Sequence, residues 1–245
     1  MAFPGFKQLK PGWEKVTTTG KRARWGEDAY MFPGRWFRYA IAGEALTVAN
    51  LHTHISATDA HDLDLVPAAA VSAGDTTITI ASLTTTLNEY ADGMLILNDV
   101  EEEGHYYLIK GNTAGTSATC TVTIDEEDGF VAALTTSQQM GLVHSMGFDV
   151  VVYPTTSLGP PVGATCVDWA DNQHGWLQTR GPGVATLHEG TAVLAGNPLG
   201  PTTQGTAGEL ELLDQSGTID YGIIAWMGDA VGVEDESSAV YWVGI

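Results

Sequence analysis

Apolar and polar residues alternate over short stretches of this chain, which is the pattern of strands that bury one face. The alternation is clearest in residues 76–80, 119–124 and 176–180, and Gly, Asn, Asp or Pro residues bound most stretches. Further short apolar segments predict strands at residues 36–42, 45–51, 94–97, 106–109, 148–153, 192–195, 221–227 and 240–245. This is the spacing of consecutive short strands, not of alternating strands and helices. We therefore expect an all-β protein whose body is a β-barrel or a β-sandwich.

The order of these segments predicts three parts. Residues 68–140 form a series of short strands and tight turns, which indicates a small β-module inserted into a larger body. The β-rich body comprises residues 36–67 and 141–245. Residues 1–35 have no regular period, yet they hold five Gly, three Pro and several large aromatic side chains. We expect this N-terminal arm to lie extended on a surface, its own or a neighbour's, with its aromatic side chains as anchors.

The charges are distributed unevenly along the chain. The 245 residues carry a net charge of −20, with 44% hydrophobic and only 16% charged residues, so a sizeable core is expected. Residues 1–38 hold eight of the ten basic residues against three acidic ones, a net charge of +5. The remaining 207 residues hold two basic and 27 acidic residues, a net charge of −25. We expect the basic arm to dock on an acidic partner, whereas the acidic body repels nucleic acid.

The arm therefore supplies the candidate interface residues, which combine large aromatic and basic side chains. They are Phe3, Phe6, Trp13, Lys21, Arg22, Arg24, Trp25, Tyr30, Phe32 and Trp36. No stretch approaches the ~18 uncharged apolar residues of a membrane-spanning helix, so no membrane partner is expected. Cys120 and Cys166 lie in apolar or Thr-rich stretches, and we interpret both as small core residues of a protein that folds in a reducing compartment.

One cluster has the residue types of a metal site. His52 and His54 are two positions apart, which places both side chains on one side of a strand, and His61 and Asp64 follow. The same spacing opens the metal site of barrel amidohydrolases, but the chain lacks the helices of a (β/α)₈ barrel. A polar surface loop is the alternative, and we favour it. The acidic turns at 101–103 and 125–128 do not match a calcium-loop spacing, so we expect them to be solvated.

Motifs of catalysis give little support to an enzyme. The sequence contains no GxSxG, Walker A, HExxH or GxGxxG motif. A pair of carboxylates acting on a polysaccharide, with Trp and Tyr side chains lining a sugar groove, is one remaining enzymatic hypothesis. A metal-dependent hydrolase using His52 and His54 is the other. We expect neither, and we expect no cofactor.

Several motifs resemble a family of phage proteins. Residues 88–99 (NEYADGMLILND) and 103–112 (EGHYYLIKGN) are similar to a pattern found in structural proteins of tailed bacteriophages. The similarity continues at residues 150–156 (VVVYPTT), 161–163 (PVG), 175–182 (GWLQTRGP) and 187–196. It spans about residues 36–245, and the longer basic, aromatic arm departs from the pattern. The resemblance implies a virion component of the capsid decoration or cement type.

The resemblance sets the expected function and partners. We expect a protein made in the host cytoplasm that binds the outer surface of the phage head and stabilises adjacent capsomers, with the arm as a staple. Its partners would be the major capsid protein and further copies of itself, with a trimer favoured over a dimer. A tail, fibre or baseplate protein that adheres to host glycans is the alternative within the virion.

Overall fold

The computed structural model describes residues 7–54, 63–100, 102–156, 159–188, 193–203, 205–213, 222–228 and 237–245. The described residues form sixteen strands and one three-residue 3-10 turn, η1 (Trp13–Lys15), so the protein is all-β as predicted. No described helix is long and apolar enough to span a membrane. The chain divides into two compact units, unit 1 (Met1–Ser56 and Met146–Ile245) and unit 2 (Ala57–Ser145), and each is described by itself.

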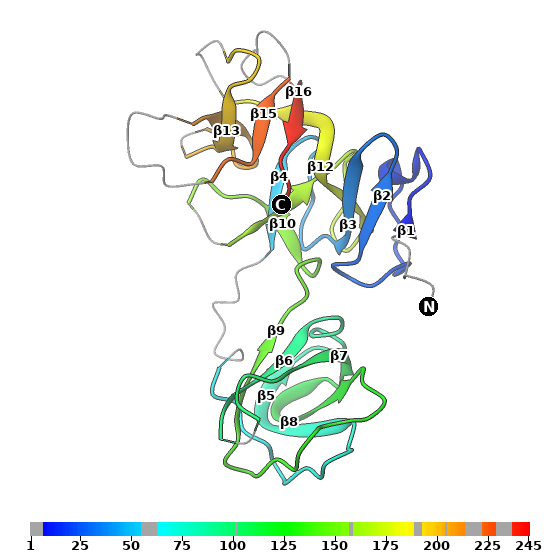
Figure 1. The fold of residues 1–245 in the computed structure, drawn as a ribbon, viewed down its shortest axis with the longest axis vertical. Coiled ribbons are helices and arrows are strands. Elements are labelled where there is room, and N and C mark those ends of the chain that lie inside the picture. The colour runs from blue at the N-terminus through cyan, green and yellow to red at the C-terminus, as the bar shows by residue number, and fades with distance from the viewer. Residues whose placement is uncertain are drawn as a thin grey trace. The chain divides into compact units, whose positions relative to one another are not determined.

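Unit 1 is built around one large sheet, shown in Figure 1. Its main path runs β1-β2-β3-β12-β16-β15-β13-β14, and β4, β10 and β11 join it through β12. The bounds are β1 (Lys7–Gln8), β2 (Asp28–Met31), β3 (Arg35–Ile41), β4 (Leu51–His54), β10 (Val150–Val152), β11 (Pro161–Ala164), β12 (His174–Thr186), β13 (Pro198–Pro201), β14 (Leu210–Leu212), β15 (Ala225–Met227) and β16 (Ser237–Trp242).

The 13-residue strand β12 joins the two ends of this sheet. Its first half pairs with β3, so that Trp176 lies opposite Tyr39, and its second half pairs with β16, so that Gly183 lies opposite Val240. The first half is almost wholly buried, because β3 and β11 both pair with it. Buried apolar clusters lie along both halves, one around Leu177 and one around Ala185.

Residues 7–35 lie on the protein's own surface, the first of the two placements expected for the arm. Strand β2 pairs with β3, and β1 adds a short parallel edge to β2 (Figure 1). Leu9, Ala29 and Met31 are buried against Phe37 and Trp176. This segment is therefore part of the hydrophobic core of unit 1. The arm was expected to be anchored by its aromatic side chains, whereas in residues 7–35 the aliphatic side chains of Leu9, Ala29 and Met31 are the ones buried in this core cluster.

Unit 2 is a five-stranded antiparallel sheet in the order β5-β8-β7-β6-β9. The strands are β5 (Thr77–Thr85), β6 (Met94–Asp99), β7 (Tyr106–Asn112), β8 (Gly115–Ile124) and β9 (Gln139–Val143). The sheet curls around a core in which Ile80, Leu95, Ile109 and Val122 are fully buried. Between its two edge strands, Leu65 bridges to Met140 of β9 and Pro67 bridges to Ile80 of β5.

These contacts set the boundaries of unit 2. The inserted module was expected at residues 68–140, but strand β9 extends to Val143 and pairs with β6. Residue Leu65 belongs to the same unit, because its backbone exchanges hydrogen bonds with Met140. A further local difference lies in unit 1, where residues 45–50 form turns and one isolated bridge from Leu46 to Trp169 instead of a strand.

Candidate functional site

A pocket of about 400 Å³ opens on unit 1 where residues 7–22 cross strands β3 and β12. We call it the basic aromatic pocket. Its lining consists of Lys7, Trp13, Val16, Thr18, Arg22, Tyr39, His174, Gly175 and Trp176. Three of these residues are aromatic and two carry a positive charge, and the described lining contains no carboxylate.

The floor of the pocket follows from strand register. Tyr39 and Trp176 lie directly opposite each other on β3 and β12, and their rings meet edge to face at 5.0 Å. His174 is two residues before Trp176, so it projects from the same face of β12. Its ring stacks on Tyr39 at 5.9 Å. The three side chains are almost fully buried and form a continuous aromatic surface.

Basic side chains lie at the mouth of the pocket. The Nζ of Lys7 lies 5.4 Å from the Trp176 ring and 3.1 Å from a carboxylate oxygen of Glu27. The backbone N–H of Arg22 donates a 2.8 Å hydrogen bond to the hydroxyl of Tyr39, which fixes this part of the segment over the floor. Trp13 lines the pocket while about half of its surface remains in solvent. The mouth therefore offers both cations and an exposed indole to a ligand.

Trp25 lies beside the pocket and contacts His174 of its floor. Its Nε1 donates to Nδ1 of His174 at 3.3 Å, and the two rings are parallel with centroids 6.1 Å apart. The Nζ of Lys21 lies 3.8 Å above the Trp25 ring. Burial, and next the charge of Lys21, lowers the pKa of His174, so this ring is neutral at pH 7 with its proton on Nε2.

The arrangement favours a ligand with an apolar or aromatic body and a negative charge. The body would lie on Tyr39 and Trp176, and the charge would face Lys7 and Arg22. An acidic segment of a protein with an adjacent apolar side chain has this chemistry. The neutral His174 adds no charge to the floor, so the positive charge stays at the mouth, where water and partners reach it.

The structure places the predicted interface residues in different environments. Trp13 and Arg22 line the pocket, whereas Lys21 and Trp25 lie beside it. Tyr30 and Trp36 are half-buried and pack edge to face at 5.4 Å on the neighbouring strands β2 and β3. Arg24 and Phe32 are exposed, and Phe3 and Phe6 lie outside the described residues.

The candidate metal ligands do not form a metal site in the described residues, but the polar surface loop that we favoured is also wrong for residues 51–54, which form the largely buried strand β4. His52 is fully buried, and its Nε2 lies 3.2 Å from Oγ1 of Thr165, which itself donates to the carbonyl of Thr47. Because the Thr165 hydroxyl donates to Thr47, its oxygen accepts a hydrogen bond from His52, so His52 holds its proton on Nε2. Burial lowers the pKa of His52 to about 3. Asp64 is exposed and belongs to unit 2, whereas His52 and His54 belong to unit 1; His61 lies outside the described residues. No group of three or more His, Cys, Asp or Glu residues in the described chain could hold a metal ion.

We expected both acidic turns to be solvated, but one of their side chains is buried. The side chain of Glu102 is almost fully buried and accepts a hydrogen bond from the hydroxyl of Tyr107. Burial, and next this bond, raises the pKa of Tyr107 to about 12. Glu126, Glu127 and Asp128 are exposed as predicted, and Glu101 lies outside the described residues.

A second cavity of about 530 Å³ in unit 1 contains an internal polar network. The Arg35 guanidinium donates to Oε1 of Gln178 at 2.7 Å, lies 3.3 Å from the Cys166 sulfur and pairs with Glu14 at 3.5 Å. Burial raises the pKa of Cys166, which keeps it a protonated thiol. These polar groups satisfy one another, so we assign the network to the stability of unit 1.

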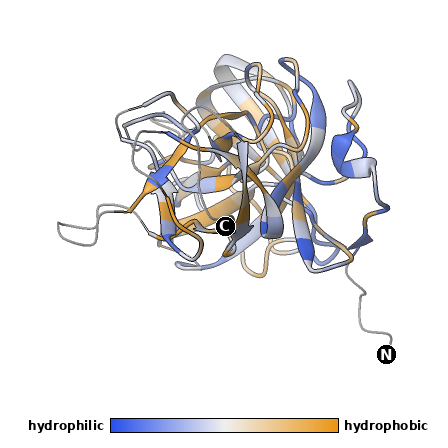
Figure 2. Cartoon of the chain, turned by 90° about the horizontal axis from the view of Figure 1, so that it is seen from above, coloured by the Kyte–Doolittle hydropathy of each residue, from blue (hydrophilic) through white to orange (hydrophobic). Residues whose placement is uncertain are grey.

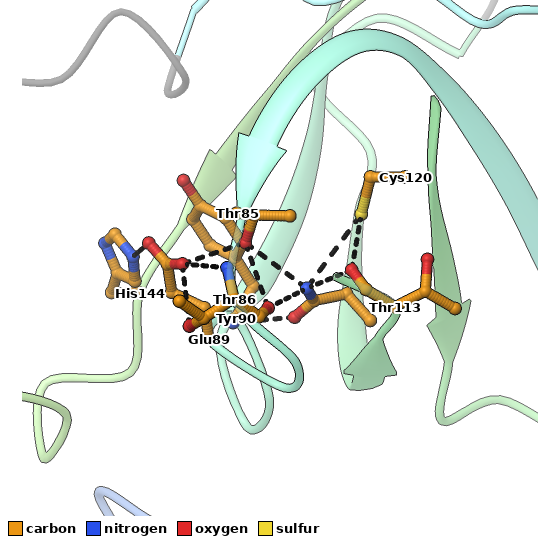
Figure 3. Close-up of polar contacts among 8 residues, drawn as sticks. Thr85, Thr86, Glu89, Tyr90, Thr113, Cys120 and His144 are labelled. Carbon is orange, nitrogen blue, oxygen red and sulfur yellow. Dashed lines mark hydrogen bonds and ion pairs between the residues drawn. The ribbon is translucent and has the colours of Figure 1, made fainter. Parts of the chain in front are cut away.

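Unit 2 holds another polar network, shown in Figure 3. The buried Asn112 amide donates to Oγ1 of Thr85 and to the carbonyls of Thr86 and Thr113, and its oxygen accepts from the N–H of Tyr90. Burial would raise the pKa of Glu89, but hydrogen bonds from Thr85, Thr86 and His144 hold it below its usual value. Cys120 is buried as predicted, donates to the Thr113 carbonyl, and has a pKa raised by burial. The network joins β5, β7 and β8 and has a structural role.

The sequence did not reveal the floor of the pocket. Tyr39 and Trp176 lie in stretches predicted as strands, but only the pairing of β3 with β12 brings them together with His174. The alternation at residues 176–180 was the one available signal, because it predicts that Trp176 and Gln178 share a face. No family model, curated protein or solved structure matches this chain.

Proposed function

We propose that this protein is a non-catalytic decoration protein of a tailed-phage capsid, and that the basic aromatic pocket docks an acidic segment of the major capsid protein. One observation supports the docking role above all. Two exposed basic side chains, Lys7 and Arg22, line a pocket with an aromatic floor in a chain of net charge −20. The resemblance of residues 36–245 to phage structural proteins supports the choice of a capsid as partner.

The charge distribution gives the pocket a direction of binding. Lys10, Lys15, Lys21, Arg22 and Arg24 are all exposed within residues 7–24. In Figure 2 the chain next to the N-terminus shows several hydrophilic stretches in blue. These cations steer an acidic surface towards the pocket, and the attraction weakens as salt screens it. Contacts of Trp13 and the floor with an apolar side chain depend much less on salt.

The first experiment is the copy number of this chain relative to the major capsid protein in purified particles. A ratio near one, or a simple fraction set by the icosahedral sites, is expected for a decoration protein. A few copies per particle would instead assign the chain to the tail or a fibre. Absence from particles would reject the virion function altogether.

Binding to particles that lack the protein then tests the pocket itself. In a co-sedimentation assay we expect Trp13→Ala to lose about 2 kcal/mol of binding, the order of an aromatic hot spot. Arg22→Glu should weaken binding and reduce its dependence on salt. Lys110→Glu is the matched control, because Lys110 is an exposed base on β7 of unit 2. Equal losses in Arg22→Glu and Lys110→Glu would contradict docking through the pocket.

A further inference from the structure

The sheet of unit 1 has an apolar outer face that sequence analysis did not identify. It lies on the second half of β12 and on its neighbours β16 and β15, which run side by side in Figure 1. Register places Pro182 opposite Tyr241, Tyr241 opposite Trp226, and Val184 opposite Ala239. We call these residues, with Val243, the uncharged face: Pro182, Val184, Trp226, Ala239, Tyr241 and Val243.

The opposite side of the same strands already belongs to the core. Ala185, Val240, Trp242, Ala225 and Met227 are buried there. An antiparallel sheet with one solvated face normally places polar residues on that face. Here Val184, Trp226, Tyr241 and Val243 are each 39–55% exposed. The strands are therefore apolar on both sides, although only one side is covered within the described protein.

The ring of Tyr241 lies against the backbone at the end of β15. Met227 pairs with Val240, and the N–H of Gly228 donates to the carbonyl of Ala239 at 2.9 Å, so β15 and β16 stay in register to the end. A Cβ atom at Gly228 would lie 3.2 Å from Cε2 of Tyr241, which shows that this ring lies against the glycine. An exposed Tyr beside a Trp is typical of the residues that contribute most to protein interfaces.

Charge decides which partner fits this surface. The residues that carry this face (181–186, 225–228 and 237–243) contain no charged side chain, and the nearest charge on β12 is the exposed Arg180, two positions before Pro182. A partner recognised by charge would therefore find at most one basic side chain, at the margin of the face. Two copies of a −20 chain repel each other over most of their surface, and an uncharged face is where they approach at the least electrostatic cost. Two identical sheet faces also pack well against each other.

We propose that the uncharged face is a self-association surface, through which two copies of this chain pack sheet against sheet about a two-fold axis. Tyr241 and Trp226 of each copy lie at its centre. The contact is isologous, since the same residues contribute from both copies. This inference does not rest on the proposed function, because it concerns a different surface and requires no capsid.

Salt distinguishes the two surfaces. Docking of an acidic partner in the basic aromatic pocket should weaken as salt rises. Association through the uncharged face should hold or strengthen as salt rises, because salt screens the repulsion between the two acidic bodies.

Sedimentation velocity of the full chain over a range of protein concentrations and salt tests the inference. We expect a species of twice the 25.9 kDa chain mass that persists at high salt. Tyr241→Glu and Trp226→Glu should each raise the dissociation constant by at least about 30-fold, the effect of losing a hot spot. Tyr106→Glu is the matched control, because Tyr106 is 67% exposed on β7 of unit 2.

Folding of Tyr241→Glu and Trp226→Glu is checked by tryptophan fluorescence, since all seven Trp residues belong to unit 1, and folding of Tyr106→Glu is checked by amide hydrogen exchange of unit 2. A wild-type chain that stays monomeric at every concentration and salt would overturn the inference. So would folded Tyr241→Glu and Trp226→Glu variants that self-associate as tightly as the wild type, or a control that loses as much. Variants that remain dimeric but lose capsid binding would assign the face to the capsid and overturn it as well.

Discussion

The indole Nε1 of Trp25 donates a hydrogen bond to Nδ1 of His174, a residue 149 positions later in the chain. The bond ties the N-terminal segment to β12, the central strand of unit 1. It also fixes the neutral tautomer of His174 on the floor of the basic aromatic pocket. The N-terminal segment and the strand that carries Trp176 therefore form one structural element.

Replacing His174 should weaken unit 1. His174→Ala removes the acceptor of Trp25 and the ring between Trp25 and Tyr39, and we expect a loss of about 2 kcal/mol. His174→Phe keeps a ring there and should lose less. Urea unfolding followed by tryptophan fluorescence measures both. Lys10→Ala, at an exposed residue of unit 1, is the control, and an equal effect there would refute the structural role of His174.

Leu9 should matter as much as an ordinary core residue, although it lies in the predicted arm. It is 2% exposed and packs in the cluster of Phe37 and Trp176. We expect Leu9→Ala to lower the free energy of unfolding of unit 1 by about 3 kcal/mol. The adjacent Lys10 is exposed, so Lys10→Ala should change it little. Similar small effects of both variants would show that the segment is separable.

Acid should destabilise unit 1 through its buried histidines. His52 has a pKa of about 3 in the folded protein, and burial also lowers the pKa of His174. Below pH 6.5 the unfolded chain binds protons at these sites more readily than the folded chain does, so stability falls as pH decreases. For His52 the slope approaches about 1.4 kcal/mol per pH unit below pH 6.5 and ends near pH 3.

His52→Gln tests this assignment. The Gln amide can donate to Thr165 in place of His52 Nε2, but it does not titrate. Urea unfolding at several pH values between 7 and 4 should therefore give a shallower pH dependence for the variant. An unchanged dependence would mean that His52 does not contribute to the acid sensitivity.

Asn112 should be essential to unit 2. Its side chain holds together β5, β7 and the turn at Tyr90 while it is itself buried (Figure 3). Asn112→Leu leaves the Thr86 carbonyl and the Tyr90 N–H without this partner, and we expect a loss of about 3 kcal/mol. Amide hydrogen exchange of residues 63–143 would show the loss. Tryptophan fluorescence should stay unchanged, since unit 2 contains no Trp.

The all-β class was readable from sequence because alternation is a local property. Residues 76–80 and 119–124 alternate, and they lie in β5 and β8 with Ile78, Ile80 and Val122 buried. The expectation for residues 45–51 failed because their small apolar side chains fit a turn as well as a strand. The basic aromatic character of residues 7–36 was also visible, since charge and residue type need no fold.

Tertiary structure alone decided which surfaces this chain presents. Sequence by itself determined the strands, the segregated charge and the aromatic residues of the N-terminal segment, all of which follow from neighbouring positions. The pocket floor required Tyr39 and Trp176 to meet across β3 and β12, a pairing set by long-range register. The uncharged face could not be predicted either, because residues 239–243 (Ala-Val-Tyr-Trp-Val) do not alternate between polar and apolar and so do not indicate which side chains face the solvent. Only the packing of Val240 and Trp242 into the core turns Tyr241 outward.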